Sequence, residues 1–511
     1  MVSAYLTLLL LTNALLWGRA GGLLSAYLGP LSVRAVVDPW SLRFYSLLGL
    51  ISGSVVCWAY YYMDGEPYFR RFLGVVIMFV GCMVILVFMN TLYGALVGWD
   101  GLGITSFLLV IYYKNRKALG RGIVTALTNR LGDAFLLVLL GLAFLPIPAT
   151  YALQILLLLT AMTKSAQYPF RRWLPAAMAA PTPVRALVHS STLVTAGVYL
   201  LLRFNHRGTE WLLAIGSTTM LMAGLCACGE IDIKKIVALR TLSQLGVIVV
   251  GLGLALKSLR FFHLMTHALF KALLFLCVGV GIHTVFGTQD LRRFSNASST
   301  LPGPRSFLSV ANLALLGFPF LAGFYSKDAI LEGFYSASQS LRGLVAFLLG
   351  VGLTTAYRLK LTRLALLGSL DPAPATLNGG GTPPWVKMPL LVLGVASVLG
   401  GFLLSPHLAT GMTTVCVSDK LLPMACIALG GGVGWRLSNV KVSFFNRIWD
   451  LTPGAQNLAG AGPGIRSAWL VDAGTGEIAR GPGWLRLYLY SQLSLYPALS
   501  LALLGTRILL V

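Results

Sequence analysis

Two lysines lie inside apolar stretches of this chain, each beside a point where the chain is interrupted. Lys164 ends the apolar run that starts at Tyr151, and Pro169 follows it. Lys327 ends the run GFPFLAGFYSK, which contains a proline and two glycines. An ammonium group in hydrocarbon costs at least ~2.5–3.5 kcal/mol, so both side chains are expected to face a protein interior. Such paired, interrupted segments indicate a duplicated membrane transporter with ionisable groups at membrane depth.

A second group of titratable side chains repeats every four residues. His263, His267 and Lys271 share one face of a predicted helix and together span about 12 Å, at about 1.5 Å per residue. This stripe can carry protons through a membrane core. His-x-x-x-His also supplies two zinc ligands on one helix face, but no third ligand and no following glutamate are evident nearby. The sequence therefore predicts a proton path and no metal site.

The chain has only 16 acidic residues, so each one inside an apolar run is informative. Asp100 is the only charged residue of the predicted span 92–112. We interpret it as a buried counter-ion; the alternative is a carboxylate that bends its helix by bonding a neighbouring hydroxyl. Arg130 and Asp133 are three residues apart and can pair on one helix face. That pair is either purely structural or supports proton transfer.

Three further basic residues have two possible interpretations each. His189 opens the polar run His-Ser-Ser-Thr inside the next apolar segment. It either satisfies a local hydrogen bond or relays protons, and the adjacent hydroxyls, which can hold water, favour the relay. Lys234 and Lys235 are interpreted as one residue that faces the interior and one that sets membrane topology. The sequence does not distinguish the two.

The composition predicts a polytopic helical membrane protein. The 511 residues are 57% hydrophobic and 11% charged, and the mean hydropathy is +0.79, whereas soluble domains carry about 25% charged residues. Apolar windows of ~20 residues follow one another without the alternation typical of an outer-membrane barrel. The net charge of +23 comes from basic clusters at predicted helix ends. Topology and anionic lipids explain those clusters better than nucleic acid does. The clusters are Arg70-Arg71, Lys114 to Arg121, Lys234-Lys235, Arg292-Arg293 and Arg358 to Arg363.

Hydrophobic windows predict about 15 membrane helices. Their ranges are 4–28, 41–63, 72–90, 92–112, 122–145, 150–168, 183–203, 210–229, 233–256, 260–286, 306–335 with an interruption, 341–366, 386–405, 412–435 and 487–510. The fold class is therefore all-α. A Pro/Gly-rich stretch at 367–385 is predicted to be a linker, and the polar, proline-containing stretch 438–486 cannot form one straight helix.

Several ordered motifs between residues 38 and 365 resemble the antiporter-like subunit-five family of NADH:ubiquinone oxidoreductase, respiratory complex I. The motifs read GWDGLGITSFLL, NRLGD, KSAQ, WLPAAM, PTPVRALVHSSTLVTAGVYL, DIKKIVAL, SQLG, THALFKALLFL and PFLAGFYSKD. Subunits of multisubunit cation/proton antiporters share most of them and are the alternative. The resemblance implies two inverted five-helix repeats, each with one broken helix, and proton translocation driven by quinone reduction in another subunit.

The resemblance also implies a division of the chain. It comprises N-terminal helices at 1–91, a first antiporter-like repeat at 92–203, a second at 204–366, the linker at 367–385, C-terminal helices at 386–437, an amphipathic lateral segment at 438–486 and a final transmembrane helix at 487–511.

By motif, the resemblance implies proton-transfer roles for a defined set of residues. The set comprises Asp100 as the acidic partner, Lys164 and Lys327 as the broken-helix lysines, Asp328 beside the second lysine, His189 as the following relay, and the stripe of His263, His267 and Lys271. Arg130, Asp133, Lys234 and Lys235 are expected to support them. An ion pair between Asp100 and Lys164 that opens and closes would switch the charge of the lysine, because a nearby carboxylate offsets the desolvation of an ammonium group.

The family's biochemistry implies a non-redox subunit of an H⁺-translocating NADH:ubiquinone reductase. FMN, iron–sulfur clusters and ubiquinone are expected in partner subunits and not in this chain, which has no dinucleotide fingerprint and no iron–sulfur cysteine cluster. The expected partners are the other membrane-arm subunits, above all the neighbouring antiporter-like subunit, and phospholipids, cardiolipin among them. Short length, the lack of a presequence before the first apolar run and the family resemblance predict a mitochondrially encoded protein of the mitochondrial inner membrane; a bacterial plasma membrane is the alternative.

The sequence departs from the family pattern in four places. The usual glutamate after Gly-Trp is Asp100, and Ala179-Ala180 occupy a position where relatives can carry a carboxylate. There is room for only one helix before Asp38, where relatives usually have two. In place of one long lateral helix, two short amphipathic pieces are expected near 440–450 and 466–490.

Overall fold

The computed structural model of this protein describes a helical bundle built from most of the first 437 residues. The described ranges are 22–28, 31–143, 150–204, 210–254, 256–284, 287, 289–291, 302–336, 341–366, 383–408 and 417–437. All of them belong to one compact unit, Met1–Trp449. The second unit, Asp450–Val511, lies outside the described residues, as do the predicted lateral segment and final helix and most of the predicted linker.

Helices make up nearly all of the described chain. They are α2 (Pro39–Tyr62), α3 (Phe69–Phe88), α4 (Leu92–Val110), α5 (Arg116–Ala143), α6 (Thr150–Lys164), α8 (Thr182–Val188), α9 (Leu193–Phe204), α10 (Glu210–Gly229), α11 (Ile233–Gly253), α12 (Lys257–Thr284), α14 (Pro302–Leu316), α15 (Ala322–Ser336), α16 (Leu341–Leu366), α17 (Pro384–Leu408) and α18 (Val417–Leu437). Between α6 and α8 lie three short turns, η1 (Phe170–Arg172), α7 (Trp173–Ala176) and η2 (Ala177–Ala179).

The polytopic helical class is confirmed. Within the described residues, 10 helical spans are long and apolar enough to cross a membrane. A chain in lipid must satisfy its backbone hydrogen bonds internally, and a helix does so within one segment. The predicted total of about 15 spans rests on window length alone. The described residues do not confirm that number.

The predicted membrane helix at 4–28 is wrong at its C-terminal end. Residues Gly22–Leu28 form strand β1, which pairs antiparallel with β2 (Leu31–Val37). Residues 4–21 lie outside the described part of the chain. Two features of the sequence explain the hairpin: Gly29-Pro30 is a turn signal that ends the apolar run, and the segment after it is rich in β-branched valine.

Both predicted interruptions are present. Helix α6 ends at Lys164, and the chain then passes through the short turns before α8 begins. Helix α14 ends at Leu316, and α15 starts at Ala322. Gly317 has φ +84° at this second break, a left-handed conformation that glycine adopts without steric cost. The two lysines therefore lie beside chain breaks, as expected.

A third interruption was not predicted. The segment 183–203, expected to be one helix, is divided into α8 and α9 by residues 189–192. There the Thr192 Oγ1 donates to the carbonyl of Leu187 at 2.8 Å, and the Ser190 hydroxyl donates to the carbonyl of Ala186. Hydroxyl groups that bond nearby backbone compete with the helical ladder, which explains the break.

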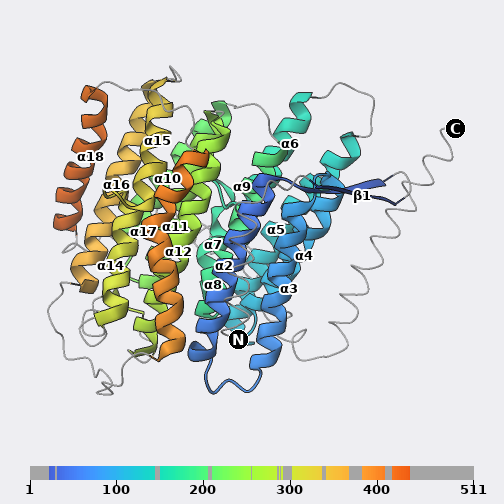
Figure 1. Cartoon of the computed structure of the whole chain (residues 1–511), viewed down its shortest axis with the longest axis horizontal. Helices are drawn as coiled ribbons and strands as arrows, with labels where there is room; N and C mark the ends of the chain where they lie inside the picture. Colours follow the sequence, from blue (N-terminus) through green and yellow to red (C-terminus); the bar gives the residue numbers. More distant parts are fainter. Residues whose placement is uncertain are drawn as a thin grey trace, which may run out of the picture. The chain divides into compact units, whose positions relative to one another are not determined.

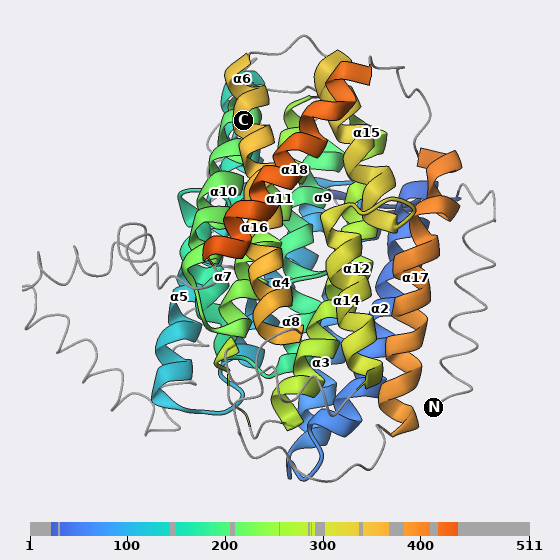
Figure 2. The ribbon, with the colours of Figure 1, turned by 90° about the vertical axis from the view of Figure 1, so that its left-hand side faces the viewer.

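Helices α11 and α12 form the interior of the bundle. Every residue of their apolar windows is buried, and α12 contacts α2, α8, α11, α14, α15 and α17. Figure 1 shows α3, α4 and α5 on one side of α12 and α16 and α18 on the other. In Figure 2, α16 lies between α10 and α18, in agreement with its contacts. The stripe-bearing helix is therefore shielded from lipid by neighbours on all sides.

Close packing of α10 on α11 depends on two glycines. A Cβ at Gly246 would lie 2.8 Å from the Gly216 carbonyl oxygen and 2.9 Å from the Met220 nitrogen. We therefore expect Gly246→Ala to force the two helices apart and to destabilise the protein by about 1–3 kcal/mol, the usual cost of overpacking. The measurement is the thermal unfolding midpoint of the purified complex. Gly74→Ala is the matched control, because a Cβ there meets nothing within 4 Å; equal midpoints for the two variants would contradict the expectation.

Candidate functional site

Lys164 lies fully buried at the C-terminal end of α6. Its exposed fraction is 0%, and its ammonium donates a hydrogen bond to the backbone carbonyl of Trp99 on α4. The Nζ atom also lies 4.0 Å from the centre of the Trp99 ring, a cation–π contact. The break after α6 places this side chain, and α4 supplies both of its contacts. Trp99 was not singled out from the sequence, although it directly precedes Asp100.

Asp100 is paired with an arginine and not with Lys164. The Arg130 Nη1 atom lies 2.6 Å from the Asp100 carboxylate and 3.3 Å from that of Asp133. The predicted pairing of Arg130 with Asp133 is confirmed. The predicted Asp100–Lys164 ion pair is not formed in this structure, because the arginine of α5 bridges the two carboxylates while Lys164 bonds the tryptophan one residue away.

Small residues allow α4, α5 and α6 to bring these groups together. A Cβ at Gly98 would lie 2.7 Å from the carbonyl oxygen of Cys82 on α3, so α4 lies close against that helix. Gly132, next to Asp133, faces Thr163, which directly precedes Lys164. Two carboxylates, a guanidinium and an ammonium therefore meet where three helices pack. Both carboxylates attract the Lys164 ammonium electrostatically.

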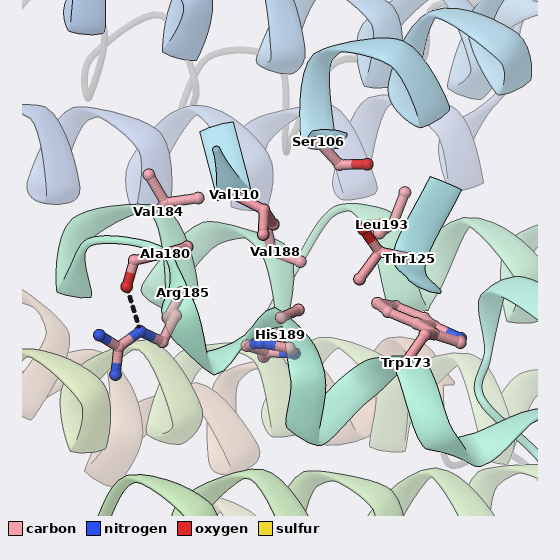
Figure 3. A pocket seen from close by; sticks show the side chains of 11 residues that line it. Ser106, Val110, Thr125, Trp173, Ala180, Val184, Arg185, Val188, His189 and Leu193 are labelled. Atoms are coloured by element: carbon pink, nitrogen blue, oxygen red, sulfur yellow. Dashed lines mark hydrogen bonds between the residues drawn. The ribbon is translucent and has the colours of Figure 1, made fainter. Parts of the chain in front are cut away.

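His189 lies at the break between α8 and α9 and faces a pocket. Its exposed fraction is 1%, and neither ring nitrogen has a hydrogen-bond partner among the described residues. Figure 3 shows the imidazole between the side chains of Arg185 and Trp173, with Ser106 and Thr125 on the pocket wall. The pocket thus combines an imidazole, a guanidinium and two hydroxyl groups in an otherwise apolar lining.

The predicted stripe on α12 is buried throughout. His263, His267 and Lys271 are each 0% exposed, and the two imidazole ring centres are 6.3 Å apart. Phe275 continues the same face one turn further, and its ring stacks on His189 at 5.9 Å between centres. His189, which is about 80 residues from the stripe in sequence, therefore contacts the residue that follows the stripe on the same helix face.

Lys327 repeats the arrangement of Lys164 at the second interruption. It is 9% exposed, and its ammonium donates to the backbone carbonyl of Leu315 at 3.0 Å, near the end of α14. A carbonyl in the last turn of a helix lacks an intrahelical partner, so the break itself provides the acceptor. Asp328 follows on α15 and is half-buried.

The two neighbouring lysines on α11 differ in burial. The Lys235 Nζ lies 3.1 Å from the Asp232 carboxylate, and both side chains are about half exposed at 46% and 45%. Lys234 is the more buried of the two. We therefore assign the inward position to Lys234 and the surface position to Lys235.

Comparison with known proteins identifies the family. The transmembrane family "NADH:quinone oxidoreductase/Mrp antiporter" matches residues 89–354. NADH-ubiquinone oxidoreductase chain 5 of Anopheles quadrimaculatus is 43% identical over 433 residues, which cover 80% of this chain and 75% of the mosquito protein. The chain belongs to the NADH:quinone oxidoreductase/Mrp antiporter family. The chain 5 protein of Locusta migratoria is 38% identical and covers 89% of this chain and 86% of its own length.

Solved structures support the family fold. A chain of the Mrp complex from Dietzia sp. DQ12-45-1b superposes with a TM-score of 0.75 at 24% identity, covering 97% of this chain and 60% of that one. A chain of the membrane-bound sulfane sulfur reductase, an archaeal respiratory membrane complex, gives a TM-score of 0.68 at 18% identity over 94% of this chain and 95% of that one. At these identities the likeness concerns the fold alone.

The region matched by the family contains every predicted site residue, from Asp100 to Asp328. Within it the structure forms two groups. The first joins Asp100, Arg130, Asp133 and Lys164 on α4, α5 and α6. The second joins the α12 stripe to α15, and His189 lies against Phe275 at its end. In the part of the chain that the structure describes, no three His, Cys, Asp or Glu side chains gather in a way that could hold a metal ion.

Buried arginines of this family member were missed by sequence reasoning. The cluster Arg358 to Arg363 was expected at a helix end, but Arg358 is 1% exposed within α16 and Lys360 is 4% exposed. Lys360 donates to the carbonyls of Cys228 and Glu230, on the neighbouring α10 and the turn that follows it. Arg240 on α11 is 0% exposed and donates to Asn312 Oδ1 at 2.8 Å. The position of these basic residues inside apolar runs was the sequence signal that could have indicated their burial.

The ion-pair network around Arg130 predicts that two substitutions within it have non-additive effects on stability. Arg130→Gln removes the charge that neutralises both carboxylates, so its effect on stability should depend on whether Asp133 is charged. We expect the stability losses of Arg130→Gln and Asp133→Asn to depart from additivity by about 0.5–3 kcal/mol, measured by unfolding of the purified complex. Arg130→Gln combined with Asp232→Asn is the control cycle and should be additive, since Asp232 pairs with Lys235. An additive first cycle would exclude the network.

Proposed function

We propose that this chain is the proton-translocating membrane-arm subunit of NADH:ubiquinone oxidoreductase. The observation that carries the proposal is the series of buried titratable groups that runs from Lys164 through His189 and the α12 stripe to Lys327. Ionisable side chains inside a membrane bundle are costly, and they are typical of proton and ion paths. The likeness to mitochondrial chain 5 proteins at 43% identity supports the same assignment.

The first step of the proposed path is a change in the environment of Lys164. Desolvation destabilises its ammonium form, whereas a nearby carboxylate stabilises that form. In this structure Arg130 holds Asp100, and Lys164 bonds the Trp99 carbonyl. Movement of the Arg130 side chain would release a carboxylate to Lys164, and its return would favour loss of the lysine proton. The bridging arginine thus replaces the simple two-residue switch expected from the sequence.

The later steps follow the geometry of α12. A proton released near Lys164 would first reach His189 and then pass Phe275 by way of water molecules. It would continue along the α12 stripe, from Lys271 through His267 to His263, and end at Lys327. Several polar atoms on this route have no partner among the described residues, including both ring nitrogens of His189 and His267 and the Lys271 Nζ. Buried polar groups are normally hydrogen-bonded, so water is the expected partner and also the proton carrier between side chains.

The surroundings of the subunit follow from the same proposal. FMN, the iron–sulfur clusters and ubiquinone would be bound by partner subunits, and this chain would be a non-redox component. Its neighbours would be other membrane-arm subunits, the adjacent antiporter-like subunit first, together with phospholipids such as cardiolipin. The chain is a multi-pass membrane protein by the 10 spans within its described residues, and the mitochondrial inner membrane is the proposed location.

A cation/proton antiporter subunit is the second candidate. The name of the matching family includes the Mrp antiporter, and the fold resembles a chain of a Mrp complex. Sodium dependence distinguishes the two functions. We expect proton translocation by the reconstituted complex to be unchanged when sodium is replaced by choline, because the proposed carriers are proton-binding side chains. Transport that requires sodium, from a preparation without flavin and iron–sulfur partners, would favour the antiporter.

Replacement of Lys164 tests the proton-transfer role directly. Lys164→Met keeps the length of the side chain and removes the titratable group. We expect proton transport through this subunit to fall by roughly tenfold or more, since a positioned proton carrier contributes about 10²–10⁴-fold. The measurement is proton pumping per NADH oxidised in reconstituted vesicles, with complex assembly followed in parallel. Lys387→Met on the exposed face of α17 is the control. Assembly that falls in proportion to activity would instead indicate a structural charge.

A further inference from the structure

His263 is hydrogen-bonded to a hydroxyl pair at the contact between α12 and α15. Its Nδ1 atom lies 2.9 Å from the Ser326 Oγ, and the Thr266 Oγ1 donates to the same Ser326 oxygen at 3.0 Å. All three side chains are 0% exposed. Ser326 directly precedes Lys327, so the second half of the broken helix contacts both the stripe and, through the lysine, the end of α14.

Each hydroxyl of this pair has a second acceptor within reach. Ser326 Oγ lies 3.4 Å from the carbonyl oxygen of Gly323, and Thr266 Oγ1 lies 3.2 Å from the carbonyl oxygen of His263. A serine hydroxyl carries one proton and two lone pairs. Ser326 can therefore accept from Thr266 and donate either to the imidazole or to the backbone, without losing a hydrogen bond in either case.

These two orientations match the two charge states of a histidine. When His263 is neutral with its proton on Nε2, Ser326 donates to the unprotonated Nδ1. When His263 gains a proton at Nδ1, Ser326 accepts from that N–H and turns its own proton toward Gly323. We propose that Ser326 is a positioning residue for proton transfer, a hydroxyl switch that holds His263 in both protonation states. The proposal rests on the proton-translocating function proposed above.

Surrounding charges explain why such a switch is needed. Lys327 from α15 and Arg358 from α16 act on His263, and His267 and Lys271 lie along the same face of α12. The positive charges of Lys327 and Arg358 oppose a positive charge on the His263 imidazole. An acceptor oxygen at Nδ1 offsets part of that repulsion. Neither ring nitrogen of His267 has a partner among the described residues, and its nearest ring contact is Phe270 at 5.6 Å. The structure thus favours His263 over His267 as the group that is protonated first.

Three variants of the intact complex test the switch. Ser326→Ala removes the hydroxyl, and we expect pumping per NADH oxidised to fall roughly fivefold for this subunit, the equivalent of about 1 kcal/mol for one hydrogen bond. Ser326→Thr keeps the hydroxyl and should retain most of the pumping. Ser397→Ala is the matched control, because Ser397 is also 0% exposed and its hydroxyl donates to a helix carbonyl, that of Gly394.

The outcomes separate this proposal from the proposed function. Normal pumping by Ser326→Ala in a preparation where Lys164→Met abolishes it would overturn the hydroxyl switch and leave the proton path intact. Equal losses for Ser326→Ala and Ser326→Thr, with assembly retained, would also overturn it, because the hydroxyl would then be irrelevant. Should Ser326→Ala fail to assemble, Thr266→Val provides the second variant. It removes the hydroxyl that donates to Ser326, and unaltered pumping would contradict the hydroxyl switch.

Discussion

Two lysine ammonium groups inside a lipid-embedded bundle must each find an acceptor, and the rest of the structure depends on how they do so. Lys164 donates to the Trp99 carbonyl, and Lys327 donates to the Leu315 carbonyl. Both lysines lie beside chain interruptions, where the helix surface is no longer continuous and polar atoms can meet. The interruptions therefore adjoin both of these buried lysines.

The interior helices bury further titratable groups at the centre of the bundle. Because α12 is covered on all sides, its four-residue repeat of titratable groups faces neighbouring helices and not acyl chains. His189 reaches the same face through Phe275, and Ser326 reaches it from α15. The two halves of the proposed path thus meet on one helix. A fold that packs two interrupted helices against a common central helix can bring together titratable groups that are distant in the sequence.

The positions that the sequence predicted well are those governed by local chemistry. Apolar windows located most of the described spans, proline and glycine located both interruptions, and the spacing of His263, His267 and Lys271 placed them on one face. The hairpin at 22–37 and the break at 189–192 were missed for a related reason. In each, part of a membrane-length apolar window was assigned to a helix although turn residues or hydroxyls offered its backbone other hydrogen bonds.

Which side chains contact one another, in contrast, was decided by the packing of the helices. Sequence alone determined that this chain spans a membrane repeatedly and hides a small number of amines, imidazoles and carboxylates, because hydrophobicity and residue spacing are properties of each segment. Only the tertiary structure decided that Asp100 meets Arg130, that Lys164 bonds Trp99, and that Ser326 meets His263. Each of these contacts joins two different helices. Which faces of two helices meet depends on steric fit along both of them, and that information is not contained in either segment by itself.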